Sequence, residues 1–214
     1  MAEPIRLSQI DDSTRGDHHH LAADDTCLYL YEYTSGRDYS FSATNNLISN
    51  LKKKPSQCSV QSLAHKTRVI GEAAIALRQS LNAGWLGFAT LVPVPGSKAR
   101  DHPDYDDRIE RICRGIGAQV DVRNLVVQTA STIASHEAAP GERVTLEQLL
   151  QLYEIDEGAA APEPRAIGII DDVLTAGTHY RAMHSILSAR FPAAPIIGLF
   201  VARRIFPPQG DDPF

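Results

Sequence analysis

The sequence predicts an α/β protein in which a parallel, twisted sheet is flanked by helices. Strand and helix patterns alternate from about residue 86 to residue 202, and this order gives a parallel sheet with right-handed crossovers. Residues 167–170 form a β-branched apolar run, typical of a strand buried on both faces. The 214 residues, 43% of them hydrophobic, are enough for one domain with a substantial core.

The composition argues against a nucleic-acid binder, a disulfide-bonded or zinc-binding protein, and a membrane protein. The formal net charge of −5 argues against a dedicated nucleic-acid binder, which normally carries a basic excess. Cys27, Cys58 and Cys113 are widely spaced and form no CxxC pair, so we expect reduced thiols rather than disulfides or a zinc site. The first residues lack a signal-peptide pattern, and the longest apolar stretch, 193–202, is too short to span a membrane. We therefore expect a cytoplasmic protein with no membrane partner.

Three segments are expected along the chain: an N-terminal extension (1–62), a core (63–202) and a surface tail (203–214). The first 25 residues or so are polar and acidic, and we expect much of this lead to lie on the surface. Alternating residues predict a strand at 27–34, with 39–43 as a second strand that could pair back on it.

Two helices are predicted before the core sheet begins. Apolar residues predict a short helix that ends at the lysines 52–54 and Pro55. These lysines are either a solvated helix end or a basic rim for phosphate or nucleic acid. A longer apolar stripe predicts a helix from about Leu63 to Gly84.

The segment after the second helix predicts an anion-binding loop. Residues 88–95 read as a buried strand with a Pro-rigid end. Small residues and two cations follow directly, at 96–100. A loop of this composition at the carboxyl end of a strand is suited to bind an anion.

The remaining elements of the core are predicted in order. A helix at 105–116 is entered through acids that suit a helix N-terminus better than a calcium loop. Residues 120–127 read as a strand, 129–143 as a polar loop, and Thr145 to Gln148 as a capping box that opens another helix. A linker at 158–164 and a last strand at 195–202 complete the pattern.

The stretch at 166–180 carries the clearest chemical signal. A turn of small residues lets backbone N–H groups approach an anion, and the helix that follows directs its positive end to the same place. Thr175 and Thr178 can add hydroxyl donors. Asp171 and Asp172 repel phosphate, but they suit ribose hydroxyls or a metal ion. These features predict a sugar-phosphate pocket; the alternative is an ordinary strand–turn–helix with a chance acidic pair.

The same stretch resembles the PRPP-binding motif of type I phosphoribosyltransferases: a hydrophobic strand, two acids, two variable residues and Thr-x-Gly-Thr/Ser. The matching residues are Asp171, Asp172, Thr175, Gly177 and Thr178. The segment at 92–100 is similar to the diphosphate loop of the same family, in the form seen in its less characterised, competence-associated branches.

The resemblance implies a Rossmann-like, type I phosphoribosyltransferase fold with a small hood within residues 1–62. It implies an enzyme of nucleotide metabolism, with PRPP or a ribose-phosphate nucleotide as ligand and Mg²⁺ as cofactor. The resemblance implies catalytic roles for Asp171, Asp172 and Lys98, and it implies that Asp171 and Asp172 bind the metal directly or indirectly. The residues implied at the 5-phosphate and ribose are Asp171, Asp172, Val173, Leu174, Thr175, Ala176, Gly177 and Thr178. Those implied at the diphosphate are Gly96, Ser97, Lys98 and Arg100.

Three functions stay open from the sequence. The first is a phosphoribosyltransferase that transfers phosphoribose to a nitrogenous base or related acceptor. The second is a non-catalytic sensor or scaffold that binds PRPP or a nucleotide, and the third is a hydrolase that uses water as the acceptor. The loop at 129–143, with His136 and Arg143 as candidates, resembles no familiar catalytic loop. The acceptor and the oligomeric state are left open, with a homodimer as one alternative.

Overall fold

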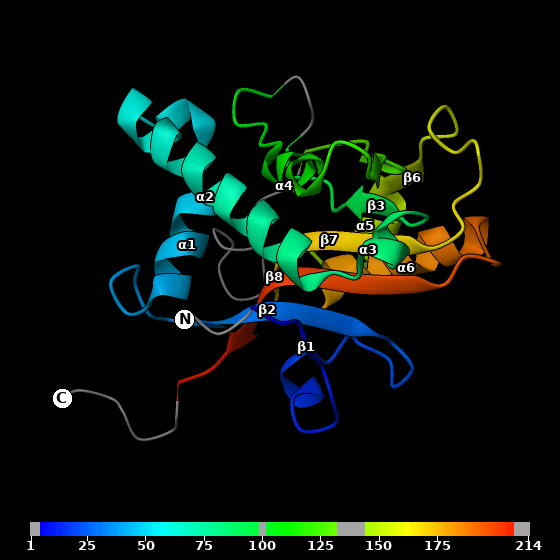
Figure 1. Ribbon diagram of the computed structural model, residues 1–214, viewed down its shortest axis with the longest axis horizontal. Helices are drawn as coiled ribbons and strands as arrows, with labels where there is room; N and C mark the ends of the chain where they lie inside the picture. Colours follow the sequence, from blue (N-terminus) through cyan, green and yellow to red (C-terminus); the bar gives the residue numbers. More distant parts are fainter. Residues whose placement is uncertain (1–4, 99–101, 132–143, 208–214) are drawn as a thin grey trace.

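The computed structural model describes residues 5–98, 102–131 and 144–207, which form an α/β fold around a six-stranded sheet (Figure 1). The strands of this sheet are β1 (Ser8–Gln9), β2 (Cys27–Thr34), β3 (Thr90–Pro93), β4 (Asp121–Val122), β7 (Ile167–Leu174) and β8 (Ile196–Ile205). Their order is β1-β2-β8-β7-β3-β4, and every neighbouring pair is parallel except β1 and β2. The predicted α/β class and mostly parallel sheet are confirmed.

Helices cover both faces of the sheet. They are α1 (Ala43–Leu51), α2 (Val60–Ser80), α3 (Ala83–Leu86), α4 (Arg108–Ile116), α5 (Leu146–Leu152) and α6 (Thr178–Arg190), with short 3₁₀ turns η1 (Arg15–Asp17) and η2 (Pro55–Gln57). Buried residues of α1, α2 and α4 form one apolar cluster with the sheet, and those of α5 and α6 form a second. The sheet is therefore the middle of three layers, as expected when helical crossovers cover a parallel sheet.

The predicted strand at 120–127 is divided between two sheets. Asp121 and Val122 pair with β3 as the short strand β4. The chain then turns, and β5 (Val126–Gln128) pairs antiparallel with β6 (Tyr153–Ile155), a strand that the sequence analysis did not predict. β6 was missed because it follows α5 directly and holds only three residues.

Side-chain caps explain where two helices begin. The Ser42 side chain accepts a hydrogen bond from the Asn45 N–H and starts α1, so the predicted strand at 39–43 is wrong. Thr145 and Gln148 form the predicted capping box of α5, with both reciprocal hydrogen bonds present.

The helix predicted from residue 105 begins instead at Arg108.

The N-terminal residues belong to the core more than their polarity suggests. β2 pairs with β8 along its length, so the sheet crosses the predicted boundary at residue 62. Ile10, His18, Leu21 and Asp25 are buried, whereas the other described residues of this lead are exposed or partly exposed, so much of it lies on the surface as expected. At the other end, β8 continues to Ile205 and so includes the first three residues of the predicted tail.

The direction of winding changes between β3 and β7. From β3 the chain passes through α4 to β4 on one side, whereas from β7 it passes through α6 to β8 on the other. Pro93 lies opposite Ile170, which confirms that the two strands are neighbours and that their carboxyl ends meet at one edge. A switch point of this kind leaves a crevice outside the strand ends, where ligands of open α/β sheets bind.

Two further expectations can be compared with the structure. Cys27, Cys58 and Cys113 are free thiols. Over the described ranges, none of the helices has the length and apolar character needed to cross a membrane.

Gly198 tests the packing between β2, β8 and α6. A Cβ atom there would lie 2.8 Å from ring carbons of Phe200 and Tyr180 and 3.0 Å from Cys27 Sγ. Because these neighbours are buried, we expect Gly198→Ala to lower the free energy of unfolding by about 1–3 kcal/mol in urea denaturation. Gly71→Ala is the control: its Cβ would meet no atom within 4 Å inside α2, and it should stabilise by about 0.5–1 kcal/mol. Equal stability of both variants would contradict this packing.

Candidate functional site

A cavity of about 100 Å³ lies at the switch point between β3 and β7. Its walls come from the loop after β3, from the end of β7 and from the first residues of α6. Lys52, directly after α1, and residues at the start of α4 complete the lining. The polar residues of the lining are Lys52, Ser97, Asp106, Arg108, Asp171, Asp172, Thr175, Thr178 and His179. Two segments that lie far apart in the sequence thus share one cavity.

Most of the predicted site residues line this cavity. Gly96 and Ser97 do so from the β3 side, and residues 171–175, 177 and 178 from the β7 side. Ala176 is absent from the described lining, and Lys98 lines a neighbouring cavity of about 280 Å³ that shares Pro95 and Gly96 with the first. Arg100, His136 and Arg143 lie outside the described residues.

The turn at 175–178 is built around one left-handed glycine. Gly177 has φ +90° and is the N-cap of α6, and the described structure has no side-chain cap there. A residue with a Cβ would be strained at this φ, and its Cβ would also lie 3.1 Å from Leu21 Cδ2. The 13-residue helix α6 therefore begins at the cavity with the positive end of its dipole, next to Thr175 and Thr178.

The N-terminal segment supports this turn from behind. The buried His18 makes a hydrogen bond through Nδ1 to the Thr175 carbonyl oxygen. The His20 N–H donates to the Ala176 carbonyl oxygen at 2.9 Å. These bonds fix two consecutive peptides of the turn, and burial keeps the pKa of His18 below its usual value.

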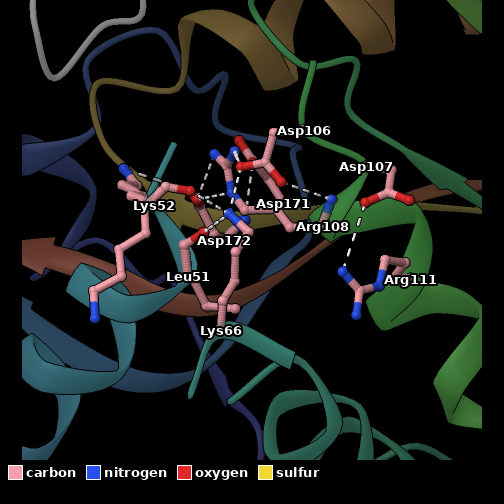
Figure 2. A network of polar contacts seen from close by, with 10 residues as sticks. Leu51, Lys52, Lys66, Asp106, Asp107, Arg108, Arg111, Asp171 and Asp172 are labelled. Atoms are coloured by element: carbon pink, nitrogen blue, oxygen red, sulfur yellow. Dashed lines mark hydrogen bonds and ion pairs between the residues drawn. The ribbon is translucent and has the colours of Figure 1, made fainter. Parts of the chain in front are cut away.

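Asp172 is the buried centre of an ion-pair network (Figure 2). Its Oδ2 accepts hydrogen bonds from Arg108 Nε at 2.9 Å and Nη2 at 2.8 Å. Lys52 Nζ lies 3.6 Å from the other oxygen, Oδ1. Although burial opposes ionisation, these two cations hold the pKa of Asp172 far below its usual range.

The network continues from Arg108 into the protein. Arg108 Nη1 donates to Asp106 Oδ2 at 2.8 Å, and the same oxygen accepts from Lys66 Nζ at 2.7 Å. Lys66 is only 2% exposed, and its Nζ also donates to the carbonyl oxygens of Leu51 at 2.6 Å and Lys53 at 2.7 Å. Two acids and two cations therefore neutralise each other at the wall of the cavity.

Asp171 has different surroundings from its neighbour, because consecutive residues of a strand point to opposite faces. Its Oδ1 accepts a hydrogen bond from the Asp172 N–H at 2.7 Å. Burial, followed by the nearby charge of Asp172, raises the pKa of Asp171 to about 7. Of the ion pairs among the described residues, none includes Asp171. It is the carboxyl group in the cavity that an incoming cation or hydroxyl donor could bind.

His179 is a neutral base at the same wall. Its Nδ1 lies 2.8 Å from the hydroxyl oxygen of Tyr153 on β6. Burial lowers the pKa of His179 to about 4, so the imidazole is uncharged at neutral pH.

Sequence reasoning missed four polar residues of the lining: Lys52, Asp106, Arg108 and His179. Lys52 belongs to the run at 52–54, for which the sequence left a basic rim open as one of two interpretations. Asp106 was assigned to a helix N-terminus, and it does accept the Arg108 N–H through Oδ1 at 3.2 Å. For Arg108 and His179 the sequence holds no local signal, because their partners Asp172 and Tyr153 come from other elements.

Comparison with known proteins assigns no family: no family model matches the chain, and no curated protein matches it. Within the described part of the chain, no group of three or more His, Cys, Asp or Glu side chains is arranged to hold a metal ion. Fold and geometry together define an α/β protein with a polar cleft at the carboxyl edge of its sheet.

Arg108 tests the ion-pair network. Replacement by methionine leaves Asp172 and Asp106 buried without their shared cation, so Arg108→Met should lower the free energy of unfolding by about 3–5 kcal/mol. Arg114→Met is the control, because Arg114 lies on the same helix, is 58% exposed and pairs with Glu110 at the surface. Its cost should stay below about 1 kcal/mol in the same denaturation assay. Similar losses in the two variants would contradict a stabilising role for the network.

Asp171 gives a pH dependence of stability with a definite sign. The folded protein retains this proton up to about pH 7, whereas the unfolded chain releases it near the usual pKa of 3.8. The folded state then binds more protons, so the contribution of Asp171 to the free energy of unfolding falls as pH rises from about 4 to 7. Asp171→Asn should remove this fall, so the variant should gain stability relative to the wild type as pH rises from about 4 to 7. A stability difference that does not change with pH would show that Asp171 ionises normally.

Proposed function

We propose that this chain is a Mg²⁺-dependent type I phosphoribosyltransferase. It would bind PRPP, transfer the phosphoribosyl group to a nitrogenous base or related acceptor, and release diphosphate. The observation that carries the proposal is that one cavity is lined by Gly96 and Ser97 after β3, by Thr175, Gly177 and Thr178 at the start of α6, and by Asp171. PRPP presents two phosphate-bearing ends joined by a ribose, which suits a cavity that holds two anion-binding loops and a carboxylate.

The 5-phosphate would lie at the turn before α6. Thr175 and Thr178 supply hydroxyl donors, and the positive end of α6 favours an anion there. Gly177 allows the left-handed backbone conformation of the turn and its close packing against Leu21. His18 and His20 hold the turn through its carbonyl oxygens, so its geometry is set before the ligand arrives.

The diphosphate would lie at the loop after β3. Gly96 and Ser97 line the cavity itself, and Lys98 lines the adjoining cavity, which is the larger of the two. The acceptor would occupy that adjoining cavity, because it meets the first along the diphosphate loop. Asn124 and Gln128 in its lining are polar amides of the kind that recognise the edge of a base.

Asp171 and the ligand would together hold the Mg²⁺ ion. The raised pKa of Asp171 reflects burial beside a like charge, and a divalent cation would favour its ionised form. Mg²⁺ is commonly held by one or two carboxylates plus substrate phosphates, so the residues present fit an ion that enters with PRPP. When bound, the ion neutralises charge on the diphosphate as it departs.

In the reaction, the C1–O bond to diphosphate breaks, and its electron pair leaves with the diphosphate. The lone pair of the acceptor nitrogen forms the C1–N bond, and the acceptor releases a proton. Positive charge develops on the ribose in the oxocarbenium-like transition state, as in glycoside chemistry. Ionised Asp171 would orient the ribose hydroxyls and stabilise that charge.

A second candidate is a non-catalytic protein that senses PRPP or a nucleotide. The observation in its favour is that Asp172 is already paired with Arg108 and Lys52. Only one of the two adjacent carboxylates is then available to the ligand. One carboxylate is sufficient for binding, but it supports catalysis less strongly than two would.

Calorimetry with PRPP and Mg²⁺ tests the binding step. We expect saturable uptake by the wild type, and Asp171→Asn should weaken it about 10- to 100-fold, because hydrogen bonds to a charged group contribute about 1.5–3 kcal/mol. The exposed Asp12→Asn removes the same charge outside the cavity lining and should leave the affinity within about twofold.

A screen of nucleobases with PRPP, followed by diphosphate release, then separates the two candidates. Acceptor-dependent release supports the transferase, whereas tight binding without release by any base supports the sensor. If the wild type takes up no PRPP, the transferase and a sensor of PRPP are both wrong, and a nucleotide sensor requires saturable uptake of a nucleotide in the same assay.

A further inference from the structure

We propose that Lys52 binds a phosphoryl oxygen of the ligand and that the buried Lys66 is the positioning residue that holds it in place. This inference deepens the proposed function and rests on it. Lys52 is the residue directly after α1. It lines the cavity but belongs to neither of the two loops described above. It would bring the N-terminal third of the chain into ligand binding.

The contact between Lys52 and Asp172 is loose. Lys52 Nζ lies 3.6 Å from Asp172 Oδ1, beyond hydrogen-bonding distance, whereas Arg108 donates two bonds of 2.8 and 2.9 Å to Oδ2. Arg108 is therefore the main partner of Asp172. The Lys52 side chain is 22% exposed, so its ammonium group can turn toward a bound anion without leaving Asp172 unpaired.

The balance of charge in the network also singles out Lys52. Asp106 and Asp172 are matched by Arg108 and Lys66, which bond to them directly. Lys52 adds one further positive charge at the cavity wall, and it makes no hydrogen bond to either of these acids. An ammonium group carries three donors and suits a phosphate as a point charge.

Lys66 fixes the backbone on both sides of Lys52. Its Nζ donates to the carbonyl oxygens of Leu51 and Lys53, the residues that flank Lys52. The same Nζ donates to Asp106, which binds Arg108. One buried ammonium therefore holds both the chain that carries Lys52 and, through Asp106, the arginine that neutralises Asp172 (Figure 2).

Calorimetry on Lys52→Gln and Lys53→Gln tests the assignment of Lys52. Lys53 is the matched control, because it is adjacent and carries the same charge but does not line the cavity. At low salt, Lys52→Gln should weaken PRPP binding at least 10-fold, and Lys53→Gln should change it less than twofold. Lys52→Arg, which keeps the charge, should restore the affinity to within about threefold. Equal affinities of Lys52→Gln and Lys53→Gln for PRPP would overturn the assignment.

Inorganic diphosphate separates this inference from the proposed function. A wild type that fails to bind PRPP would overturn the proposed function. Weaker binding of inorganic diphosphate by Lys52→Gln than by Lys53→Gln would, even so, support Lys52 as an anion-binding residue.

A double-mutant cycle tests the positioning role of Lys66. Lys66→Met should weaken PRPP binding in the wild-type background, and it should have little further effect when Lys52 is already glutamine. Variants are compared under conditions where circular dichroism shows each to be folded. A Lys66→Met effect of equal size in both backgrounds would indicate a general structural role and overturn the positioning role.

Discussion

The ion pair between Asp172 and Arg108 is the interaction on which the cleft depends. It joins β7 to α4, and through Asp106 and Lys66 it joins both to the end of α1. A buried carboxylate is tolerated here because Arg108 donates two hydrogen bonds to it and Lys52 lies nearby. The network separates the surroundings of the adjacent acids: Asp172 is paired within the wall, and Asp171 is the acid that we propose binds the ligand.

The second constraint is the close packing around the turn before α6. Gly177 brings the backbone close to Leu21, and residues 18–20 bind the carbonyl oxygens of Thr175 and Ala176. A segment with the composition of a polar extension is thus part of the proposed phosphate site. The fold supplies the remainder, because β3 and β7 meet where the winding reverses and α4 and α6 leave toward opposite faces.

Local sequence signals predicted the parts of this structure that depend on local interactions. The apolar run at 167–170, the capping box at Thr145 and the turn at 175–178 each lie within a few residues and were placed correctly. Long-range pairing was not predictable in the same way: β2 joins the sheet only because β8 lies beside it, and β6 needs β5. Lys66 looks like a solvated helix residue until its three acceptors are in place.

The most direct measurement of the central claim is a crystal structure of the protein with PRPP and Mg²⁺. We expect the 5-phosphate at residues 175–178, the diphosphate at residues 96–97, and Asp171 within reach of the ribose hydroxyls or the ion. PRPP bound at another surface, or a cleft that stays empty at saturating ligand, would contradict the account.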